Sequence, residues 1–220
     1  MERIGHRGAP REFPENSLPA FRRAFELGAD AIELDVHATS DGEVVVHHDP
    51  AIGRDANAYR GSAIAGLVLA QLRAVRLDKG IGIPTLAEVL DIVPMGRRVY
   101  VEIKGEGIEE LVAAVVRANT VDCAVHSFDH DAIARMRRIA PEIPRGILYD
   151  RAIDVEGAMS ATGARDVWPN WKLIDRETVD LVHARGGRVC AWTVNSVGPV
   201  LGLGIDAVCT DDVRLFRGLV

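Results

Sequence analysis

The fold prediction rests on residues 31–48, which read AIELDVHATSDGEVVVHH. Two strand-like runs, 31–37 and 43–48, flank the dipeptide Asp41 and Gly42, which is typical of a tight hairpin turn. The second run is therefore expected to return antiparallel to the first.

Closing this turn with Ser40 opposite Glu43 fixes the expected register of the hairpin. Asp35 then faces His48 across the two strands. Because side chains alternate along a strand, one face of the hairpin gathers two acids and imidazole groups. Its expected members are Glu33, Asp35, His37, Val46 and His48.

Outward from the hairpin, short apolar runs alternate with amphipathic segments, a pattern that predicts an α/β protein with a parallel sheet. The nine strand candidates are 3–8, 31–37, 43–48, 98–104, 123–128, 145–149, 165–169, 188–194 and 206–210. The seven helix candidates are 17–27, 85–93, 107–118, 130–140, 155–162, 175–185 and 196–203. Setting aside the returning arm of the hairpin leaves eight strands, which predicts a (β/α)8 TIM barrel.

The chain shows no linker, repeat or low-complexity tract, so residues 1–220 are expected to form a single barrel domain. Residues 49–84 lie between the hairpin and the next helix candidate. A segment of this length is expected to be a lid or an insertion after the second strand.

Composition narrows the classes of function. The net charge is −6 at 48% hydrophobic and 26% charged residues, and no basic stripe of the kind that binds nucleic acid is visible. No apolar run is long enough for a spanning helix, so stable membrane insertion is not expected. The three cysteines stand in apolar runs, which predicts buried free thiols. Together with the absence of a signal-like N-terminus, this favours a cytoplasmic protein, a monomer or homodimer, with a small-molecule partner.

Charged residues recur at the ends of predicted barrel strands, where the active sites of such barrels lie. Glu102 and Lys104 share one face of an otherwise apolar run. The three clustered acids Glu33, Asp35 and Glu102 provide oxygen ligands, which favour a hard divalent cation such as Ca2+ or Mg2+. Histidines at these strand ends are suited to proton transfer near neutral pH.

The sequence resembles the glycerophosphodiester phosphodiesterase family over nearly its whole length. The resemblance lies in the order and spacing of many short motifs. These are HRG at 6–8, PENS at 14–17, GAD at 28–30, IELDV at 32–36, DG at 41–42, HD at 48–49, IPTL at 83–86, VEIK at 101–104, SF at 127–128, WTVN at 192–195, GID at 204–206 and TD at 210–211.

The resemblance implies metal-dependent hydrolysis of a glycerophosphodiester to sn-glycerol 3-phosphate and an alcohol, by way of a cyclic phosphate. It implies that His6 and His48 form the general acid–base pair. The implied cation ligands are Glu33, Asp35 and Glu102, and the implied substrate-binding residues are Arg7, Lys104, Trp192, Glu15 and Asn16. The last two residues have an alternative role at the start of the helix near Ser17.

Two stretches depart from the family pattern. Arg54-Asp55-Ala56 follows the His-Asp pair where the family often has an Arg-Thr-Thr-like stretch, and Val213 stands where the family usually has proline. Both departures concern loops, and therefore substrate choice.

The other histidines carry weaker signals. His47 is expected to face away from the acids, and His37 shares their face and is a secondary candidate for contact with the metal. His126, His130 and His183 show no pattern beyond ordinary surface or core use.

Three rival functions remain open from the sequence. A lysophospholipase D-type phosphodiesterase would need an apolar entrance, for which residues 63–69 are a candidate. A non-catalytic barrel that only binds phosphate esters would be marked by loss of a histidine or acid, and none is missing. A metal-dependent sugar isomerase would not explain Arg7 and Lys104.

Overall fold

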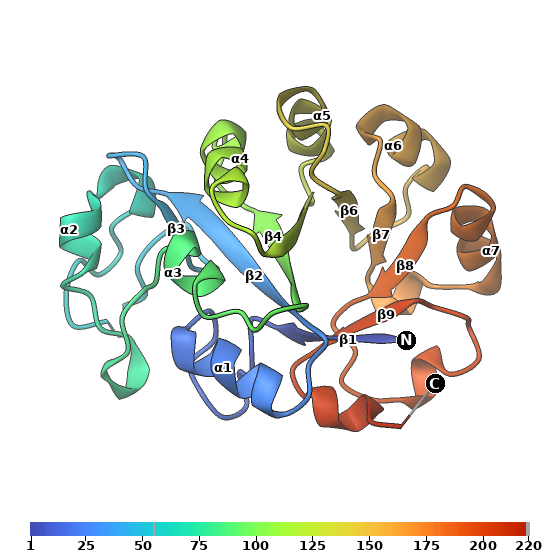
Figure 1. Cartoon of the computed structure of the whole chain (residues 1–220), viewed down its shortest axis with the longest axis horizontal. Coiled ribbons are helices and arrows are strands. Elements are labelled where there is room, and N and C mark those ends of the chain that lie inside the picture. The colour runs from blue at the N-terminus through green and yellow to red at the C-terminus, as the bar shows by residue number, and fades with distance from the viewer. Residues whose placement is uncertain (55, 219–220) are drawn as a thin grey trace.

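The computed structural model describes residues 1–54 and 56–218 (Figure 1). The strands are β1 (Glu2–His6), β2 (Ala31–Ala38), β3 (Val44–Val46), β4 (Arg98–Ile103), β5 (Asp122–Ser127), β6 (Arg145–Tyr149), β7 (Asp166–Pro169), β8 (Arg188–Ala191) and β9 (Ala207–Thr210). The α-helices are α1 (Leu18–Glu26), α2 (Leu69–Leu72), α3 (Leu86–Leu90), α4 (Glu109–Arg117), α5 (His130–Ile139), α6 (Val155–Thr162) and α7 (Arg176–Ala184). Short 3-10 helices span Ile64–Gly66, Asp78–Gly80, Trp171–Leu173, Gly198–Val200 and Val213–Phe216.

Eight parallel strands close into a barrel with helices outside it (Figure 1). β1 pairs in parallel with both β2 and β9, which closes the ring. β3 is the one antiparallel strand among the described residues, and it pairs with β2. The predicted (β/α)8 barrel with an added hairpin is therefore confirmed.

The barrel interior is filled in layers by side chains from alternate positions. Apolar and aromatic residues form the middle of this interior: Ile4, Ala31, Tyr100, Ala124, Leu148, Trp168, Cys190, Ala207 and Cys209. At the N-terminal end of the strands, Glu2 accepts a hydrogen bond from the Tyr100 hydroxyl at 2.9 Å and also pairs with Arg188. The barrel interior is thus a packed core at this end of the strands.

The predicted hairpin register is wrong by one residue. Val36 lies opposite Val46 and His37 opposite Val45, and the His47 amide donates to the Asp35 carbonyl at 3.0 Å. The turn is one residue longer than expected, because Thr39 accepts from the Glu43 amide through its hydroxyl and donates to Asp41. A threonine side chain has replaced a backbone bond in closing the turn.

Most predicted helices start where the sequence places a capping side chain. Ser17, Thr85, Asp129 and Asp175 each accept a hydrogen bond from an amide in the first turn of α1, α3, α5 and α7. The predicted helix over 196–203 is wrong. That segment holds only the 3-10 turn Gly198–Val200, and Gly202 and Gly204 have positive φ angles that end helical winding.

The insertion at 49–84 has a small hydrophobic core of its own. Its buried side chains pack against Val45 of β3: Ile52, Ala56, Ile64, Leu67, Leu72, Val75 and Ile83. Figure 1 shows the segment, with α2, at the outer side of the barrel beside β3. The predicted lid is therefore at least a packed insertion, and a role in gating stays a prediction. None of the helices in the described part of the chain is both long and apolar enough to cross a membrane.

Candidate active site

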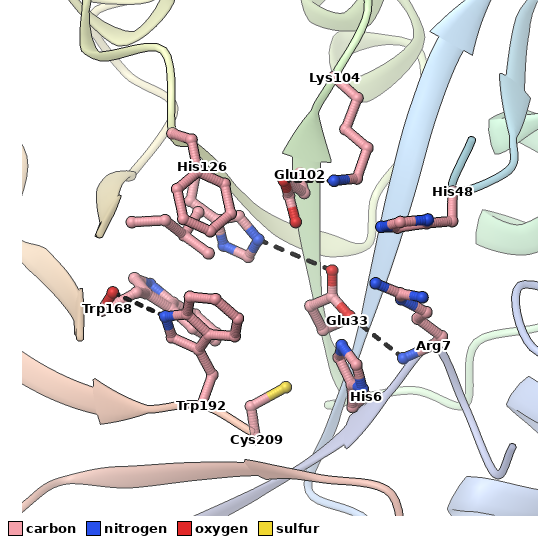
Figure 2. Close-up of a pocket in the computed structure, with 12 residues that line it drawn as sticks. His6, Arg7, Glu33, His48, Glu102, Lys104, His126, Trp168, Trp192 and Cys209 are labelled. Carbon is pink, nitrogen blue, oxygen red and sulfur yellow. Dashed lines mark hydrogen bonds and ion pairs between the residues drawn. The ribbon is translucent and has the colours of Figure 1, made fainter. Parts of the chain in front are cut away.

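A cavity of about 240 Å³ opens at the C-terminal ends of the barrel strands (Figure 2). It is lined by His6, Arg7, Glu33, His48, Glu102, Lys104, His126, Phe128, Leu148, Trp168, Trp192 and Cys209. Seven residues predicted from the sequence are in this lining. Of the other predicted residues, Asp35 and Asn16 are buried beside the cavity and Glu15 is exposed at its edge.

His6 ends β1 and is held by a carboxylate. Its Nδ1 lies 2.8 Å from Oδ1 of Asp211, which follows β9, and Asp211 is itself bonded by the Asn195 amide at 2.6 Å. Burial lowers the pKa of His6, but the hydrogen bond to Asp211 and the charge of Glu33 outweigh it, so the pKa is raised. The second ring nitrogen of His6 is left to face the cavity.

Arg7 sits in a strained turn that aims it at the acids. Its φ is 52°, and its backbone amide donates to Oε2 of Glu33 at 3.1 Å. The next residue, Gly8, has φ 90°, and a Cβ there would lie 2.7 Å from the backbone of Ala20 in α1. Only glycine permits this close approach of the turn to the helix, which explains the HRG motif.

Asp35 is fully buried and surrounded by donors. Its carboxylate lies 3.0 Å from Nε of Arg7 and 3.5 Å from Nζ of Lys104, and it accepts from the Asn16 amide at 2.8 Å. Burial raises the pKa of Asp35, but the charges of Arg7 and Lys104 more than offset burial, so its pKa is lowered. Asn16 therefore positions Asp35, and Ser17, not Asn16, caps α1.

Glu102 is the acid whose pKa is most clearly affected by the neighbouring carboxylates. It lies in β4, level with Asp35 in β2, and 3.0 Å from Nζ of Lys104. Burial, then the charges of Asp35 and Glu33, raise the pKa of Glu102 to about 8 despite Lys104. An additional positive charge in the cavity would relieve this repulsion.

His48 lines the cavity although the register was mispredicted. β3 ends at Val46, so the side chains of His47 and His48 do not have to alternate between the two faces of the hairpin. Nδ1 of His48 lies 2.8 Å from Oδ1 of Asp49. Nε2 of His37 lies 3.1 Å from the His48 carbonyl oxygen, and this contact supports the backbone at His48. Burial lowers the pKa of both His37 and His47.

One wall of the cavity is aromatic. Trp192 donates from Nε1 to the carbonyl of Trp168 at 2.9 Å, and its ring meets Phe128 edge to face at 5.2 Å. Figure 2 shows Trp168 and Trp192 on the side opposite Arg7 and Lys104. The cavity thus has a charged wall and an apolar wall, as expected for a ligand with an ionic and a less polar part.

The sequence analysis gave no role to His126 or Asp211. His126 faces the cavity from β5 and lies 3.8 Å from Oε1 of Glu33, and Asp211 holds His6. Asp211 belongs to the TD motif at 210–211. Its place beside His6 could have been inferred from the pairing of the first and last strands in a closed barrel. For His126 the one signal was the alternation of side chains along its strand. It lies level with Glu102, but this follows only once the register of β4 and β5 is known.

The chain matches known proteins over its whole length. Residues 6–215 match the model of the glycerophosphoryl diester phosphodiesterase family. A glycerophosphodiester phosphodiesterase of Caldanaerobacter subterraneus subsp. tengcongensis is 32% identical, with 99% of this chain and 96% of that protein covered. A glycerophosphodiester phosphodiesterase of Bacillus altitudinis is 30% identical, with 94% and 93% covered.

Solved structures agree with this assignment. An Oleispira antarctica phosphodiesterase, in complex with the product sn-glycerol-3-phosphate, has a TM-score of 0.88 at 25% identity, with 97% of this chain and 94% of that chain covered. A Thermotoga maritima glycerophosphodiester phosphodiesterase has a TM-score of 0.84 at 26% identity, with 97% and 96% covered. The chain therefore belongs to the glycerophosphoryl diester phosphodiesterase family and is an enzyme of that class.

Proposed function

We propose that this phosphodiesterase releases sn-glycerol 3-phosphate and an alcohol from glycerophosphodiesters with the help of a divalent cation, Ca2+ or Mg2+. The observation that carries the proposal is the gathering of three histidines, Arg7, Lys104 and clustered acids around one cavity. The family match supports the reaction class, and the product named for the Oleispira antarctica relative supports the substrate class.

The acids of the site fit a cation. Glu33, Asp35 and Glu102 lie on neighbouring strands, and Oδ1 of Asp35 is buried without a hydrogen bond among the described residues. The raised pKa of Glu102 likewise signals acids without enough neutralising charge. These three residues would hold the cation. When bound, it would stabilise charge on the phosphoryl oxygens and lower the pKa of the attacking hydroxyl.

Arg7 and Lys104 are suited to bind the non-bridging phosphate oxygens. Both line the cavity and both already approach a carboxylate oxygen of Asp35. Guanidinium and ammonium groups bind phosphate oxygens through the same charge-assisted hydrogen bonds. Glu15 bonds to Arg7, and Asn16 to Asp35, so their part in substrate binding would come through those two neighbours.

The histidines would move the protons in two steps. In the first step the glycerol 2-hydroxyl oxygen bonds to phosphorus and gives its proton to His6, while the bond to the alcohol oxygen breaks and that oxygen takes a proton from His48. The product is a cyclic 1,2-phosphate. In the second step water bonds to phosphorus and gives a proton to His48, and the ring oxygen leaves with the proton of His6. Each histidine returns to its starting state.

The aromatic wall favours a second substrate class. Trp192, Trp168 and Phe128 give the alcohol side of the cavity an apolar surface, which is what a lysophospholipid would need. We therefore keep a lysophospholipase D-type activity as the alternative substrate choice. The three free, buried cysteines support a reducing cytoplasm as the location.

The test is an assay coupled to detection of glycerol 3-phosphate, run on enzyme stripped of metal and then supplied with Mg2+ or Ca2+. Glycerophosphodiesters and lysophospholipids are compared as substrates. We expect chelation to abolish turnover and added cation to restore it. Glu33→Gln, Asp35→Asn and Glu102→Gln should each lower both cation affinity and rate. Full activity in excess EDTA after prolonged dialysis would disprove the role of the cation.

A further inference from the structure

His126 is a buried imidazole whose ring nitrogens have no hydrogen-bond partner among the described residues. It lies in β5 with 1% of its surface exposed, and neither Nδ1 nor Nε2 is bonded. Leaving a buried polar group without a partner destabilises the fold. The ring therefore either serves only as packing between Tyr100 and Trp168, or it binds something in the cavity.

Packing holds the His126 ring in one orientation. Its centroid lies 4.4 Å from that of Trp168 and 6.3 Å from that of Tyr100, stacked in the second case. Gly146, the next residue across the sheet, leaves room for Trp168, because a Cβ there would lie 2.8 Å from its Nε1. The imidazole is thus fixed with Nε2 toward Glu33, as Figure 2 shows.

The spacing between these groups suits a shared ion better than a hydrogen bond. Nε2 of His126 lies 3.8 Å from Oε1 of Glu33, beyond hydrogen-bond length. Two ligands that each lie about 2.1 Å from one ion are at most about 4.2 Å apart. One ligand atom each from Glu33, Glu102 and His126 all lie within 4.8 Å of one another, so a small closing movement would bring them around one cation.

The other oxygen of Glu33 is already engaged, which leaves Oε1 for this purpose. Oε2 accepts from the Arg7 amide at 3.1 Å. Asp35, by contrast, is bonded to Asn16 and flanked by Arg7 and Lys104. Both carboxylate oxygens of Asp35 thus face donor or cationic groups of the protein, whereas neither ring nitrogen of His126 is hydrogen-bonded among the described residues.

We propose that His126 Nε2 is a direct ligand of the cation, alongside Glu33 and Glu102, and that this nitrogen ligand raises the affinity of the site for transition-metal ions relative to Ca2+. The inference rests on the cation dependence of the proposed function. Imidazole suits transition-metal ions, whereas Ca2+ takes oxygen ligands. A nitrogen in the ligand set would raise the affinity for Mn2+ with no comparable gain for Ca2+.

The test uses the metal-free full chain titrated with Mn2+ and examined by pulsed electron paramagnetic resonance. A coordinated imidazole adds 14N modulation to the Mn2+ echo, and growth with 15N-histidine should convert that signal to the 15N pattern without any substitution. His126→Gln should abolish the modulation and raise the Kd for Mn2+ by about 10-fold or more, while the Kd for Ca2+ changes by less than about 3-fold. His130→Gln is the matched control, because its Nε2 bonds to the Leu148 carbonyl, and it should keep the modulation.

The outcomes separate this inference from the proposed function. Mn2+ that binds without histidine modulation in the wild-type chain, or modulation that persists in folded His126→Gln, overturns the role of His126 and leaves the cation dependence standing. A wild-type chain that binds no divalent cation in the titration overturns both. If His126→Gln fails to fold, His6→Gln and His48→Gln test the other two histidines of the cavity: modulation that persists in both supports His126, and modulation lost in either overturns its role.

Discussion

At the scale of single residues, each candidate acid–base histidine is held by a carboxylate. Asp211 bonds Nδ1 of His6 and Asp49 bonds Nδ1 of His48, both at 2.8 Å. Such a bond fixes the ring orientation and leaves the other nitrogen for proton transfer. Asp49 is the neighbour of His48 in the sequence, whereas Asp211 reaches His6 only because β1 lies beside β9 in the closed barrel.

The first prediction separates the two adjacent histidines. His48→Ala, like His6→Ala, should lower kcat by about 10²-fold or more, because each removes a group that transfers a proton. His47→Ala should change kcat little, since His47 does not line the cavity described here. The measurement is steady-state turnover of folded variants, checked by circular dichroism. A larger loss in His47→Ala than in His48→Ala would contradict the assignment.

The second prediction concerns pH. Because Asp211 contributes to the raised pKa of His6, Asp211→Asn should lower that pKa. A base must be neutral to accept a proton, so the acid limb of kcat/KM should lie above pH 6.5 in the wild type and move to lower pH in the variant. The raised pKa also stabilises the fold at low pH, and this contribution is lost as the pH rises through the folded pKa. If the acid limb of kcat/KM lies at the same pH in Asp211→Asn as in the wild type, a group other than His6 is responsible for it.

At the scale of elements, the hairpin and the insertion after it form one packed unit. Val45 points from β3 into the small core of residues 49–84, and Lys79 of this segment donates to the Glu12 carbonyl in the loop after β1 at 2.9 Å. The insertion thus supports two segments that carry site residues: β3 before His48, and the loop after Arg7.

The third prediction tests that supporting role. Leu72 is 1% exposed in this core, so Leu72→Ala should destabilise the fold by about 2–5 kcal/mol and lower Tm by several degrees. Leu111→Ala, at a site 37% exposed on α4, should have little effect. The measurement is thermal unfolding together with the substrate profile. A changed substrate range with unchanged Tm would instead indicate a lid.

The sequence was sufficient for the architecture but not for every local register. Strand parity, capping side chains and the Asp41-Gly42 turn predicted the barrel and the added hairpin. The register failed by one residue because the Thr39 hydroxyl accepts from the Glu43 amide across the turn, a local side-chain contact that the two-residue turn expected at Asp41 and Gly42 leaves out. His48 was nevertheless assigned to the site by its motif. Because β3 ends before His48, the error in register does not decide where this side chain points.

At the scale of the whole molecule, closure of the barrel builds the site from strands far apart in the sequence. β1 lies between β2 and β9, which brings His6 to Glu33 on one side and to Asp211 on the other. The sequence motifs predicted the candidate site residues, but not that His126 lies close to Glu33 and Glu102. That position became visible only when the register of β4 and β5 set it level with Glu102.

The fourth prediction concerns the glycerol 2-hydroxyl as the proposed nucleophile. A hydroxyl on the carbon next to the ester oxygen is already near phosphorus, and such proximity is worth an effective molarity of about 10⁵ M or more. Substrates with the glycerol 2-hydroxyl should therefore be cleaved far faster than 2-deoxy analogues of equal charge. Equal rates for both would make water the direct nucleophile and require new roles for His6 and His48.

The most direct measurement is a phosphorus NMR time course of glycerophosphocholine turnover with the cation-loaded enzyme. We expect loss of the substrate resonance, a transient cyclic 1,2-phosphate, and accumulation of sn-glycerol 3-phosphate, with free choline as the other product. The addition of EDTA before substrate should leave the substrate resonance unchanged. Accumulation of phosphocholine would show that the other phosphorus–oxygen bond is broken and would contradict the proposed reaction.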